Sequence, residues 1–454
     1  MKLVIIGGGP AGVTAAGEAA RTGAGVTLVS EAPIGGRATH ASFVPSKVLL
    51  HAAEARRARG DKSLATADEL AAIRADTDAI AKARADRMRN ALSDSGARIA
   101  EGVARFASAA TVEVTSASGV RTLPFDKAIV AAGSEPRFPT AFFGAASEKP
   151  DGHHVVAPRH VRAMIDLPKS ILVIGGGATG AEHAHAFLSL GVEVTWLLDD
   201  LGILPRFDRE LADSLGDALM ERGVKLVHGK RIVSVVHDPK QGVLASLEGG
   251  RTYAAERAFV AVGRRADTAR LGLVELGIAL RSDGTVPVDG FGRTSVDSIY
   301  AVGDTSEGAH SSARAEATGW TAARHATAQK VEALVPAAFV EAVYTTPEVA
   351  RVGLSPREAL GRGGELDLRT HDFGGSLRAT FDGVGRDKHA RGIVRVVSEP
   401  EGGKLLGATA IGPHAAEVLG PIAVAIRLGA SARDLAHVFL PAPGYGEIAT
   451  QALR

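Results

Sequence analysis

A short apolar run, a glycine-rich turn and a helical stretch open the chain. Residues 3–6 are all apolar and predict a buried strand, and the turn that follows reads Gly-Gly-Gly-Pro-Ala-Gly. A helix is expected over residues 13–21, and residues 25–30 predict a second strand. The order strand, turn, helix, strand predicts one βαβ unit at the start of the chain.

The same order of elements returns in the middle of the chain. Residues 170–174 predict a strand, a Gly-Gly-Gly-Ala-Thr-Gly turn follows, and a helix to residue 190 precedes a strand over residues 191–198. An internal duplication of one nucleotide-binding unit explains the repeat. Residues 46–96 are rich in Ala and Arg and predict helices, to which we assign no chemistry.

From about residue 336 the chain has no phosphate-binding pattern. The alternating residues 392–397 predict a strand and residues 415–428 a helix, so an α+β module is expected to close the chain. Residues 136–150 are rich in turn residues and predict the link into the second unit. The expected fold class is α/β, with two Rossmann-like dinucleotide-binding domains and a C-terminal α+β domain.

Composition limits the functions that are open to the protein. The 52 basic and 51 acidic residues among 454 leave a formal charge of +1 without a local basic cluster, so no nucleic-acid partner is expected. No cysteine is present, which excludes disulfides, thiolate nucleophiles and cysteine-ligated metals, and no metal site is expected. The chain starts without the apolar stretch of a signal peptide, and its apolar runs are short, so a cytoplasmic protein without membrane insertion is expected.

The first glycine turn matches the dinucleotide fingerprint. Gly7, Gly9 and Gly12, with Pro10 and Ala11 between them, stand between the first strand and the first helix. Glycines at this spacing permit a tight turn, a close approach of the backbone to a pyrophosphate, and close packing of helix on strand. The helix N-terminus favours the anion. A glycine turn without a ligand is the alternative, which the context and the duplication disfavour.

The second glycine turn has the same spacing. Gly175, Gly177 and Gly180 repeat the fingerprint, and Ala178 and Thr179 lie inside it. Two fingerprints in one chain imply two bound dinucleotides.

Acidic residues follow the second strand of each unit. Glu31, or Ser30 one place earlier, is expected to hydrogen-bond the ribose hydroxyls of the first dinucleotide. In the second unit, Asp199 and Asp200 would repel a 2′-phosphate, so NADH is modestly favoured over NADPH. Arg206 lies a few residues on and would act the other way, and a solvated turn is the alternative for the two aspartates.

Further motifs stand in a fixed order along the chain. Besides the two fingerprints they are Ala-Ala-Gly-Ser-Glu-Pro at 131–136, Gly-Arg-Arg at 263–265, Ser-Ile-Tyr-Ala-Val-Gly-Asp at 298–304, Tyr-Thr-Thr-Pro-Glu-Val-Ala-Arg-Val-Gly at 344–353, Leu-Leu-Gly at 405–407 and Ile-Gly-Pro at 411–413. With these motifs the chain resembles, nearly end to end, the flavin-dependent pyridine nucleotide-disulfide oxidoreductases. That family includes dihydrolipoamide dehydrogenase, glutathione reductase and mercuric reductase.

The resemblance implies FAD at the first fingerprint, NAD(P)H at the second, and a homodimer formed by the C-terminal module. It implies an FAD-binding part made of residues 1–149 and 269–335, an NAD(P)-binding domain over 150–268, and a dimerisation domain over 336–454. The aspartate that matches Asp304 contacts the ribityl or phosphate part of FAD in such proteins. Further cofactor contacts are implied for Gly36, Ala104, Ala132, Gly133, Gly263 and Arg264.

The chain departs from this family where the relatives carry their redox-active cysteines. Ala38 and Phe43 stand at those two positions. The C-terminal histidine that serves as the acid–base residue in the relatives is also missing, although Pro443 and Glu447 match the residues that follow it. The alternative is that His437 takes the place of this histidine from another position in the sequence. Either the protein is catalytically inactive, or its reduced flavin gives electrons directly to an acceptor. The two intact fingerprints favour the second explanation.

Lys47 and Glu182 match residues that pair beside the flavin in the family. A cation there would stabilise negative charge on a reduced flavin, and the glutamate would orient the cation. A surface salt bridge worth under about 1 kcal/mol is the alternative. Ala178 stands where relatives often carry a bulky residue. The small alanine side chain would leave the nicotinamide pocket more open.

Residues around the missing sulfur chemistry are candidates for acceptor binding and proton transfer. His40 would donate a proton, or it would lie solvated in a loop. Phe43 and Tyr445 would stack on a planar acceptor, although Phe43 would otherwise only fill volume, and Glu447 keeps its acid–base position. Arg37 would reach the FAD pyrophosphate or point to solvent.

We therefore expect an FAD-dependent NAD(P)H oxidoreductase that passes electrons through its flavin directly to a small diffusible acceptor such as a quinone. One rival function is the reduction of an external disulfide or sulfur compound. The other is a catalytically silent flavoprotein subunit that binds a partner complex through its Ala- and Arg-rich helices. The departures from the family lie in the pocket where the acceptor is expected to bind.

Overall fold

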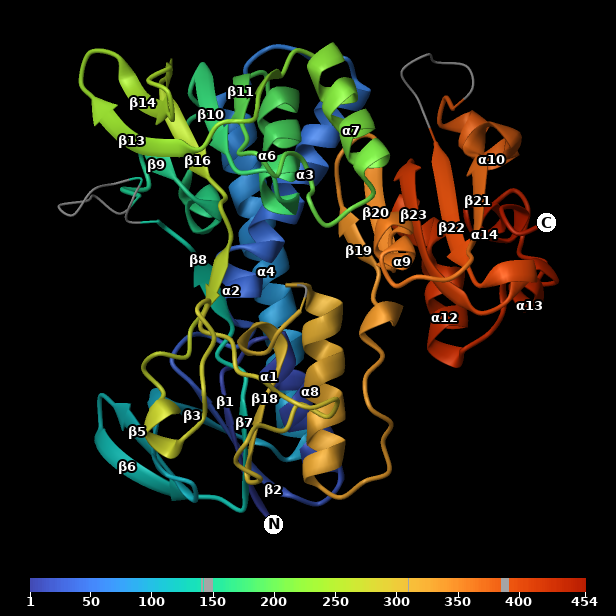
Figure 1. Ribbon diagram of the computed structural model, residues 1–454. Helices are drawn as coiled ribbons and strands as arrows, with labels where there is room; N and C mark the ends of the chain where they lie inside the picture. The colour runs from blue at the N-terminus through green and yellow to red at the C-terminus, as the bar shows by residue number, and fades with distance from the viewer. Residues whose placement is uncertain (140–141, 143–149, 309, 385–391) are drawn as a thin grey trace.

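The computed structural model describes residues 1–139, 142, 150–308, 310–384 and 392–454. Its chain forms three modules, each built around one five-stranded sheet. Figure 1 shows the first sheet at the bottom of the view, the second at the top and the third on the right, with α3 and α4 running between the first two. The predicted link over residues 136–150 lies largely outside the described residues, as does the expected domain boundary at residue 149.

The first sheet is parallel and carries the first glycine turn. In spatial order its strands are β18 (Ile299–Ala301), β7 (Lys127–Val130), β1 (Lys2–Ile6), β2 (Gly25–Ser30) and β3 (Arg98–Glu101). Along β1, Leu3 and Ile5 are buried in one core and Val4 and Ile6 in another. Both faces of the sheet are therefore covered, which explains the unbroken apolar run.

Two helices cover one face of the first sheet. They are α1 (Pro10–Arg21) and α8 (Ser312–Ala326), which lie side by side (Figure 1). Helix α1 begins three residues before the predicted start, because Pro10 takes the first helical position, where a missing N–H costs nothing.

The second sheet repeats the arrangement of the first. Its strands are β12 (Lys225–Val227), β11 (Glu193–Leu197), β10 (Ser170–Ile174), β16 (Arg257–Val260) and β9 (Val155–Val156), all parallel. Helix α6 (Ala178–Ser189) follows the second glycine turn, and α7 (Arg209–Glu221) precedes β12. The two parallel sheets confirm the predicted α/β fold with two Rossmann-like units.

The C-terminal module is an antiparallel sheet with short helices. Its strands are β19 (Glu341–Val343), β20 (Glu348–Gly353), β23 (Leu405–Gly412), β22 (Ile393–Ser398) and β21 (Asp367–Asp372). Its helices are α9 (Pro356–Leu360), α10 (Leu377–Phe381), α11 (Ala415–Val418), α12 (Gly420–Leu428), α13 (Ala432–Ala436) and α14 (Gly446–Gln451). The helix predicted over 415–428 is divided in two, because Pro421 starts a new helix and cannot donate to the preceding turn.

Smaller sheets complete the first two modules. They are β4 (Val103–Ser108) with β5 (Thr111–Ser116) and β6 (Gly119–Pro124); β13 (Ile232–Asp238) with β14 (Gly242–Leu247) and β15 (Thr252–Ala255); and β8 (Ser134–Pro136) with β17 (Arg264–Ala266). The β8–β17 pair joins two segments that are far apart in the sequence and places Arg264 opposite Pro136.

Helices α2 (Gly36–His40), α3 (Phe43–Ala58) and α4 (Ala67–Ser95) fill the space between the first two modules. Leu49 and Ala53 of α3 belong to the same buried core as Ala181 and Ala184 of α6. A helix that follows the first unit is therefore packed against the helix that follows the second glycine turn. This packing brings residues of both units to one site.

Candidate active site

One cavity of about 1440 Å³ extends over the carboxyl ends of strands in both parallel sheets. Ile6, Val29 and Val302 line it from the first sheet, and Val260 lines it from the second. In open α/β sheets ligands bind in the crevice outside these strand ends. The cavity is large enough for two extended ligands to approach each other.

The two glycine turns border this cavity with the same geometry. Gly9 precedes α1 with φ −77°, and Gly177 precedes α6 with φ −73°, so neither needs to be glycine for its backbone. A Cβ atom built on either residue has no protein atom within 4 Å. The space that such a Cβ would take is cavity, which fits a ligand that lies directly against the backbone.

The third glycine of each fingerprint serves packing instead. A Cβ on Gly12 would lie 1.8 Å from the carbonyl oxygen of Gly7, and one on Gly180 would lie 2.0 Å from that of Gly175. The missing side chains at Gly12 and Gly180 allow each helix to approach its strand closely. Neither glycine lines the cavity. Within each fingerprint, one glycine therefore serves the fold and another leaves room for a ligand.

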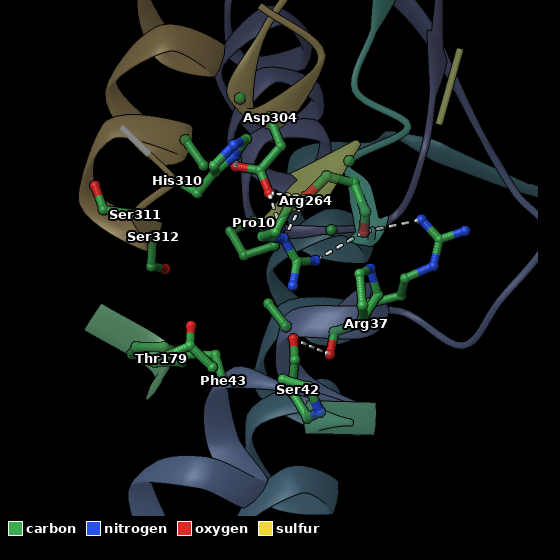
Figure 2. Close-up of a pocket in the computed structure, with 18 of the residues that line it drawn as sticks. Pro10, Arg37, Ser42, Phe43, Thr179, Arg264, Asp304, His310, Ser311 and Ser312 are labelled. Atoms are coloured by element: carbon green, nitrogen blue, oxygen red, sulfur yellow. Dashed lines mark hydrogen bonds and ion pairs between the residues drawn. The ribbon is translucent and has the colours of Figure 1, made fainter. Parts of the chain in front are cut away.

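Asp304 lies on the cavity wall just after β18 and is surrounded by hydrogen-bond donors. Figure 2 shows Arg264 and His310 on either side of its carboxylate. Ser134 donates to Asp304 Oδ2, His310 Nδ1 lies 3.3 Å from Oδ1, and Arg264 Nε lies 3.8 Å from Oδ2. Burial alone would raise the pKa of Asp304, but His310, Ser134 and Arg264 together lower it below its usual range. The ionised carboxylate is placed to accept from a ligand hydroxyl.

Glu31 and Arg37 lie on the same wall and have partners that the sequence did not indicate. Glu31 accepts from Arg270 Nη2 at 2.9 Å, and Arg37 forms an ion pair with Asp267. Arg37 also donates to the carbonyl oxygen of Ala132 at 3.4 Å, so it lies against the protein and not free in solvent. Asp267 and Arg270 follow β17 without a recognisable motif, and only the fold shows that they line the cavity.

Lys47 of α3 and Glu182 of α6 both line the cavity and contact each other. Lys47 Nζ donates to Glu182 Oε1 at 2.6 Å. The Glu182 side chain is only 8% exposed, so the pair is not the surface salt bridge considered as the alternative. Two aromatic rings flank the ammonium group, with the ring centroid of Tyr344 at 4.3 Å and that of Phe43 at 5.7 Å from Nζ.

His183 is a buried neighbour of this pair that the sequence did not single out. Its Nδ1 donates to the carbonyl oxygen of Thr179 at 2.8 Å, so its Nε2 accepts, and Ser46 Oγ lies 3.4 Å away. The ring stacks on Phe259 with centroids 4.2 Å apart. Burial lowers the pKa of His183 to about 4, which makes the imidazole neutral at pH 7.

Most of the other expected cofactor residues also line the cavity. Those that line the cavity are Gly7, Pro10, Ala11, Gly36, Ala104, Ala132, Gly133, Gly175, Ala178, Thr179, Asp199, Gly263 and Arg264. Arg206 also lines it, but its guanidinium is paired with Glu341.

Three expected catalytic residues do not line the cavity of their own chain. His40 Nε2 lies 2.9 Å from the carbonyl oxygen of Ile34. Tyr445 donates to Asp382, and Glu447 accepts from Ser376 Oγ at 3.3 Å, both within the C-terminal module. His437, the alternative histidine, is exposed and bound to the carbonyl oxygen of Arg433. One chain by itself therefore does not bring these side chains to Lys47.

Two further findings concern the described parts of the chain only. None of their helices is both long enough and apolar enough to cross a membrane. None of their His, Asp and Glu side chains form a group of three that would hold a metal ion.

Comparisons with known proteins agree with this geometry. Residues 1–329 match the pyridine nucleotide-disulphide oxidoreductase family, and residues 340–453 match its dimerisation domain. A dihydrolipoyl dehydrogenase of Thermus scotoductus is 32% identical over 98% of this chain and 95% of its own length. One of Halobacterium salinarum is 31% identical over 99% of this chain and 95% of its own length.

Solved structures show the same fold. LpdA from Mycobacterium tuberculosis has a TM-score of 0.90 and 28% identity, covering 100% of this chain and 99% of its own. The flavoprotein disulfide reductase RclA from Escherichia coli shares the fold, with a TM-score of 0.85, 22% identity and coverage of 100% of this chain and 99% of its own.

The chain therefore belongs to the class I pyridine nucleotide-disulphide oxidoreductase family, as a variant without cysteine. It is an enzyme, an FAD-dependent pyridine nucleotide oxidoreductase, and its dimerisation domain supports a homodimer.

Proposed function

We propose that this enzyme passes electrons from NADH through its flavin directly to a small diffusible acceptor such as a quinone, without a dithiol relay. The observation that carries the proposal is the absence of cysteine from the entire chain. No thiolate is available to attack a disulfide or to store electrons as a dithiol. Phe43 lines the cavity where the relatives carry the second cysteine, and its ring is partly exposed there.

The cavity has the features that two dinucleotides need. The open backbone at Gly9 would lie against the FAD pyrophosphate, and that at Gly177 against the pyrophosphate of NAD(P)H. Asp304 would accept from the ribityl or phosphate part of FAD, and Glu31 from a ribose hydroxyl. When bound, the flavin supplies the hydride acceptor and electron donor of the reaction.

Lys47 would act on the charge that develops during this reaction. Its ammonium group lies on the cavity and is held by Glu182. A cation held in a partly buried place stabilises negative charge more than a solvated one, since little reorganisation is required. Ala178 leaves space beside the pair for a nicotinamide ring.

The exposed rings of Phe43 and Tyr344 favour a planar acceptor. Both line the cavity and flank Lys47, and aromatic rings stack on flat, apolar molecules. The name of the family, pyridine nucleotide-disulphide oxidoreductase, favours a disulfide acceptor instead, but this chain lacks the thiolates for that chemistry.

Several finer assignments belong to the same proposal. Asp199 on the cavity wall favours NADH over NADPH. Tyr445 and Glu447 act at a flavin only if the homodimer brings them to the cavity of the second copy. The proposed limits are residues 1–149 and 269–335 for the FAD-binding part, 150–268 for the NAD(P)-binding domain and 336–454 for the dimerisation domain, and the proposed location is the cytoplasm.

A panel of acceptors tests the proposal. Steady-state oxidation of NADH is measured with 1,4-benzoquinone, menadione, lipoamide and glutathione disulfide, without added thiol. We expect turnover with the quinones and little with the disulfides. Efficient turnover of lipoamide would overturn the proposal, and a flavin that NADH does not bleach would indicate a silent subunit.

A further inference from the structure

Tyr344 contacts both members of the Lys47–Glu182 pair. Its backbone N–H donates to Glu182 Oε1 at 3.1 Å, and this is the same oxygen that accepts from Lys47 Nζ at 2.6 Å. Its ring centroid lies 4.3 Å from the Lys47 ammonium nitrogen. One residue of the C-terminal module therefore touches the carboxylate with its backbone and the cation with its side chain.

The fold fixes the position of this residue from the C-terminal side. Tyr344 directly follows β19, whose last residue, Val343, is fully buried in the core that also contains Ala181 of α6. The next residue, Thr345, is buried as well. The backbone of Tyr344 is thus held between two buried neighbours, while the residue as a whole is 45% exposed and lines the cavity.

The ring lies within the range in which an ammonium group is attracted to an aromatic face. That range extends to about 6 Å from the ring centroid, and the attraction grows as water is removed. Phe43 also falls within it at 5.7 Å, but Tyr344 is closer by more than 1 Å. Glu182 fixes the ammonium through one oxygen only, so the ring supplies the second restraint on its direction.

We propose that Tyr344 is a positioning residue that orients the Lys47 ammonium group toward the reacting end of the flavin by a cation–π contact. This inference rests on the proposed role of Lys47 in flavin reduction. The ring shields one side of the Lys47 ammonium group from water. The Tyr344 backbone N–H holds the Glu182 carboxylate, which accepts the hydrogen bond from that ammonium group. A residue that enters from the C-terminal module thereby adjusts a charge carried by α3.

Three variants separate the ring from the rest of the residue. Tyr344→Leu removes the ring but keeps the backbone donor, Tyr344→Phe keeps the ring, and Tyr253→Leu removes a tyrosine from β15, outside the cavity. Two quantities are measured on the FAD-loaded protein: the limiting rate constant of anaerobic flavin reduction by NADH, and the flavin midpoint potential from dye equilibration.

Tyr344→Leu should lower the limiting rate constant about two- to thirtyfold, the range of one cation–π contact. It should also make the midpoint potential more negative, without weakening NADH binding. Tyr344→Phe should keep the rate constant and the midpoint potential close to their wild-type values. Tyr253→Leu should change neither quantity. Unchanged rate constant and potential in Tyr344→Leu at full FAD content would overturn the proposal.

A fluorinated series keeps the test decisive if the leucine variant does not fold. Replacing Tyr344 by phenylalanine, 4-fluorophenylalanine and 3,5-difluorophenylalanine weakens the negative face of the ring stepwise with almost no change of shape. The potential and the rate constant should fall in this order, and a flat series would overturn the proposal. Since the potential does not depend on NADH, a wild-type flavin that NADH fails to reduce would contradict the proposed function separately.

Discussion

Lys47 Nζ and Glu182 Oε1 lie 2.6 Å apart although 135 residues separate them in the sequence. The contact exists because α3 and α6, the helices that carry them, share one buried core. It connects the unit that carries the first glycine turn with the unit that carries the second. The proposed reaction requires two bound dinucleotides to meet at this point.

Removing the Lys47 ammonium should slow flavin reduction more than it weakens binding. Lys47→Ala is expected to lower the limiting rate constant of flavin reduction by NADH on the order of a hundredfold, the effect of losing one preorganised charge. Stopped-flow absorbance at 450 nm, with NADH varied, separates this rate constant from the dissociation constant. Lys82→Ala is the control, because it removes a lysine from the Lys82–Asp86 ion pair, which is far more exposed than the Lys47–Glu182 pair. A higher NADH dissociation constant with an unchanged limiting rate constant would contradict the assigned role.

Valine at Gly9 or at Gly177 should separate the two dinucleotide sites. Neither position has a protein atom within 4 Å of a new Cβ, and both have negative φ, so both variants should fold. Gly9→Val is expected to be purified largely without FAD. Gly177→Val should keep its FAD and bind NADH at least about tenfold more weakly, as a clash with the ligand costs more than 1.4 kcal/mol. Flavin absorbance per protein and NADH titration measure the two outcomes, and full flavin content in Gly9→Val would contradict the first site.

NADH should be the better substrate of the two nicotinamide nucleotides. Asp199 lines the cavity, and Arg206 is already paired with Glu341, which leaves its charge largely neutralised toward a 2′-phosphate. We expect kcat/KM for NADH to exceed that for NADPH roughly tenfold or more. Arg206→Gln should leave kcat/KM for NADPH within about twofold, equivalent to roughly 0.4 kcal/mol. A large loss with NADPH in that variant would show that Arg206 does bind the phosphate.

His183 should make stability fall in mild acid. Its pKa is lowered from 6.5 to about 4 in the folded protein, so the unfolded chain binds a proton first as the pH falls. The stabilisation is present above pH 6.5 and is lost progressively toward pH 4. This one group should cost roughly 2 kcal/mol of unfolding free energy between pH 7 and pH 5. Urea titrations of the wild type and His183→Leu at the two pH values measure the difference.

Two comparisons make that measurement specific. His51→Asn removes an exposed histidine and should keep the wild-type pH dependence. Some dependence should also persist in His183→Leu, because burial lowers the pKa of His185 as well. An identical fall in stability from pH 7 to pH 5 in wild type and His183→Leu would rule out the buried histidine as its source.

Local sequence patterns predicted the parts of the site that are made locally. Each glycine turn is set by a strand and a helix that are adjacent in the sequence, so Gly9 and Gly177 were found from spacing alone. Asp304 and the Lys47–Glu182 pair were assigned by resemblance, and the structure places all three on one cavity.

The remaining residues depend on contacts between distant segments, which spacing does not encode. Tyr344 reaches Lys47 only because β19 packs beside α6, and Asp267 reaches Arg37 only through the β8–β17 pair. His183 lies next to Glu182 in the sequence, but its burial and its low pKa follow from Phe259 and the packing of the second sheet. His40 was singled out from its place in the motif, and the structure places its Nε2 beside the Ile34 carbonyl oxygen, a contact that the motif does not encode.

The oxidative half-reaction tests the central claim most directly. The wild-type flavin is reduced anaerobically with one equivalent of NADH and then mixed rapidly with either 1,4-benzoquinone or lipoamide, while absorbance at 450 nm follows reoxidation. Because a chain without cysteine must hand over electrons from the flavin itself, the quinone should reoxidise it at least as fast as steady-state turnover, and lipoamide at least about a hundredfold more slowly. Reoxidation by lipoamide as fast as by the quinone, without added thiol, would contradict a direct transfer from flavin to acceptor.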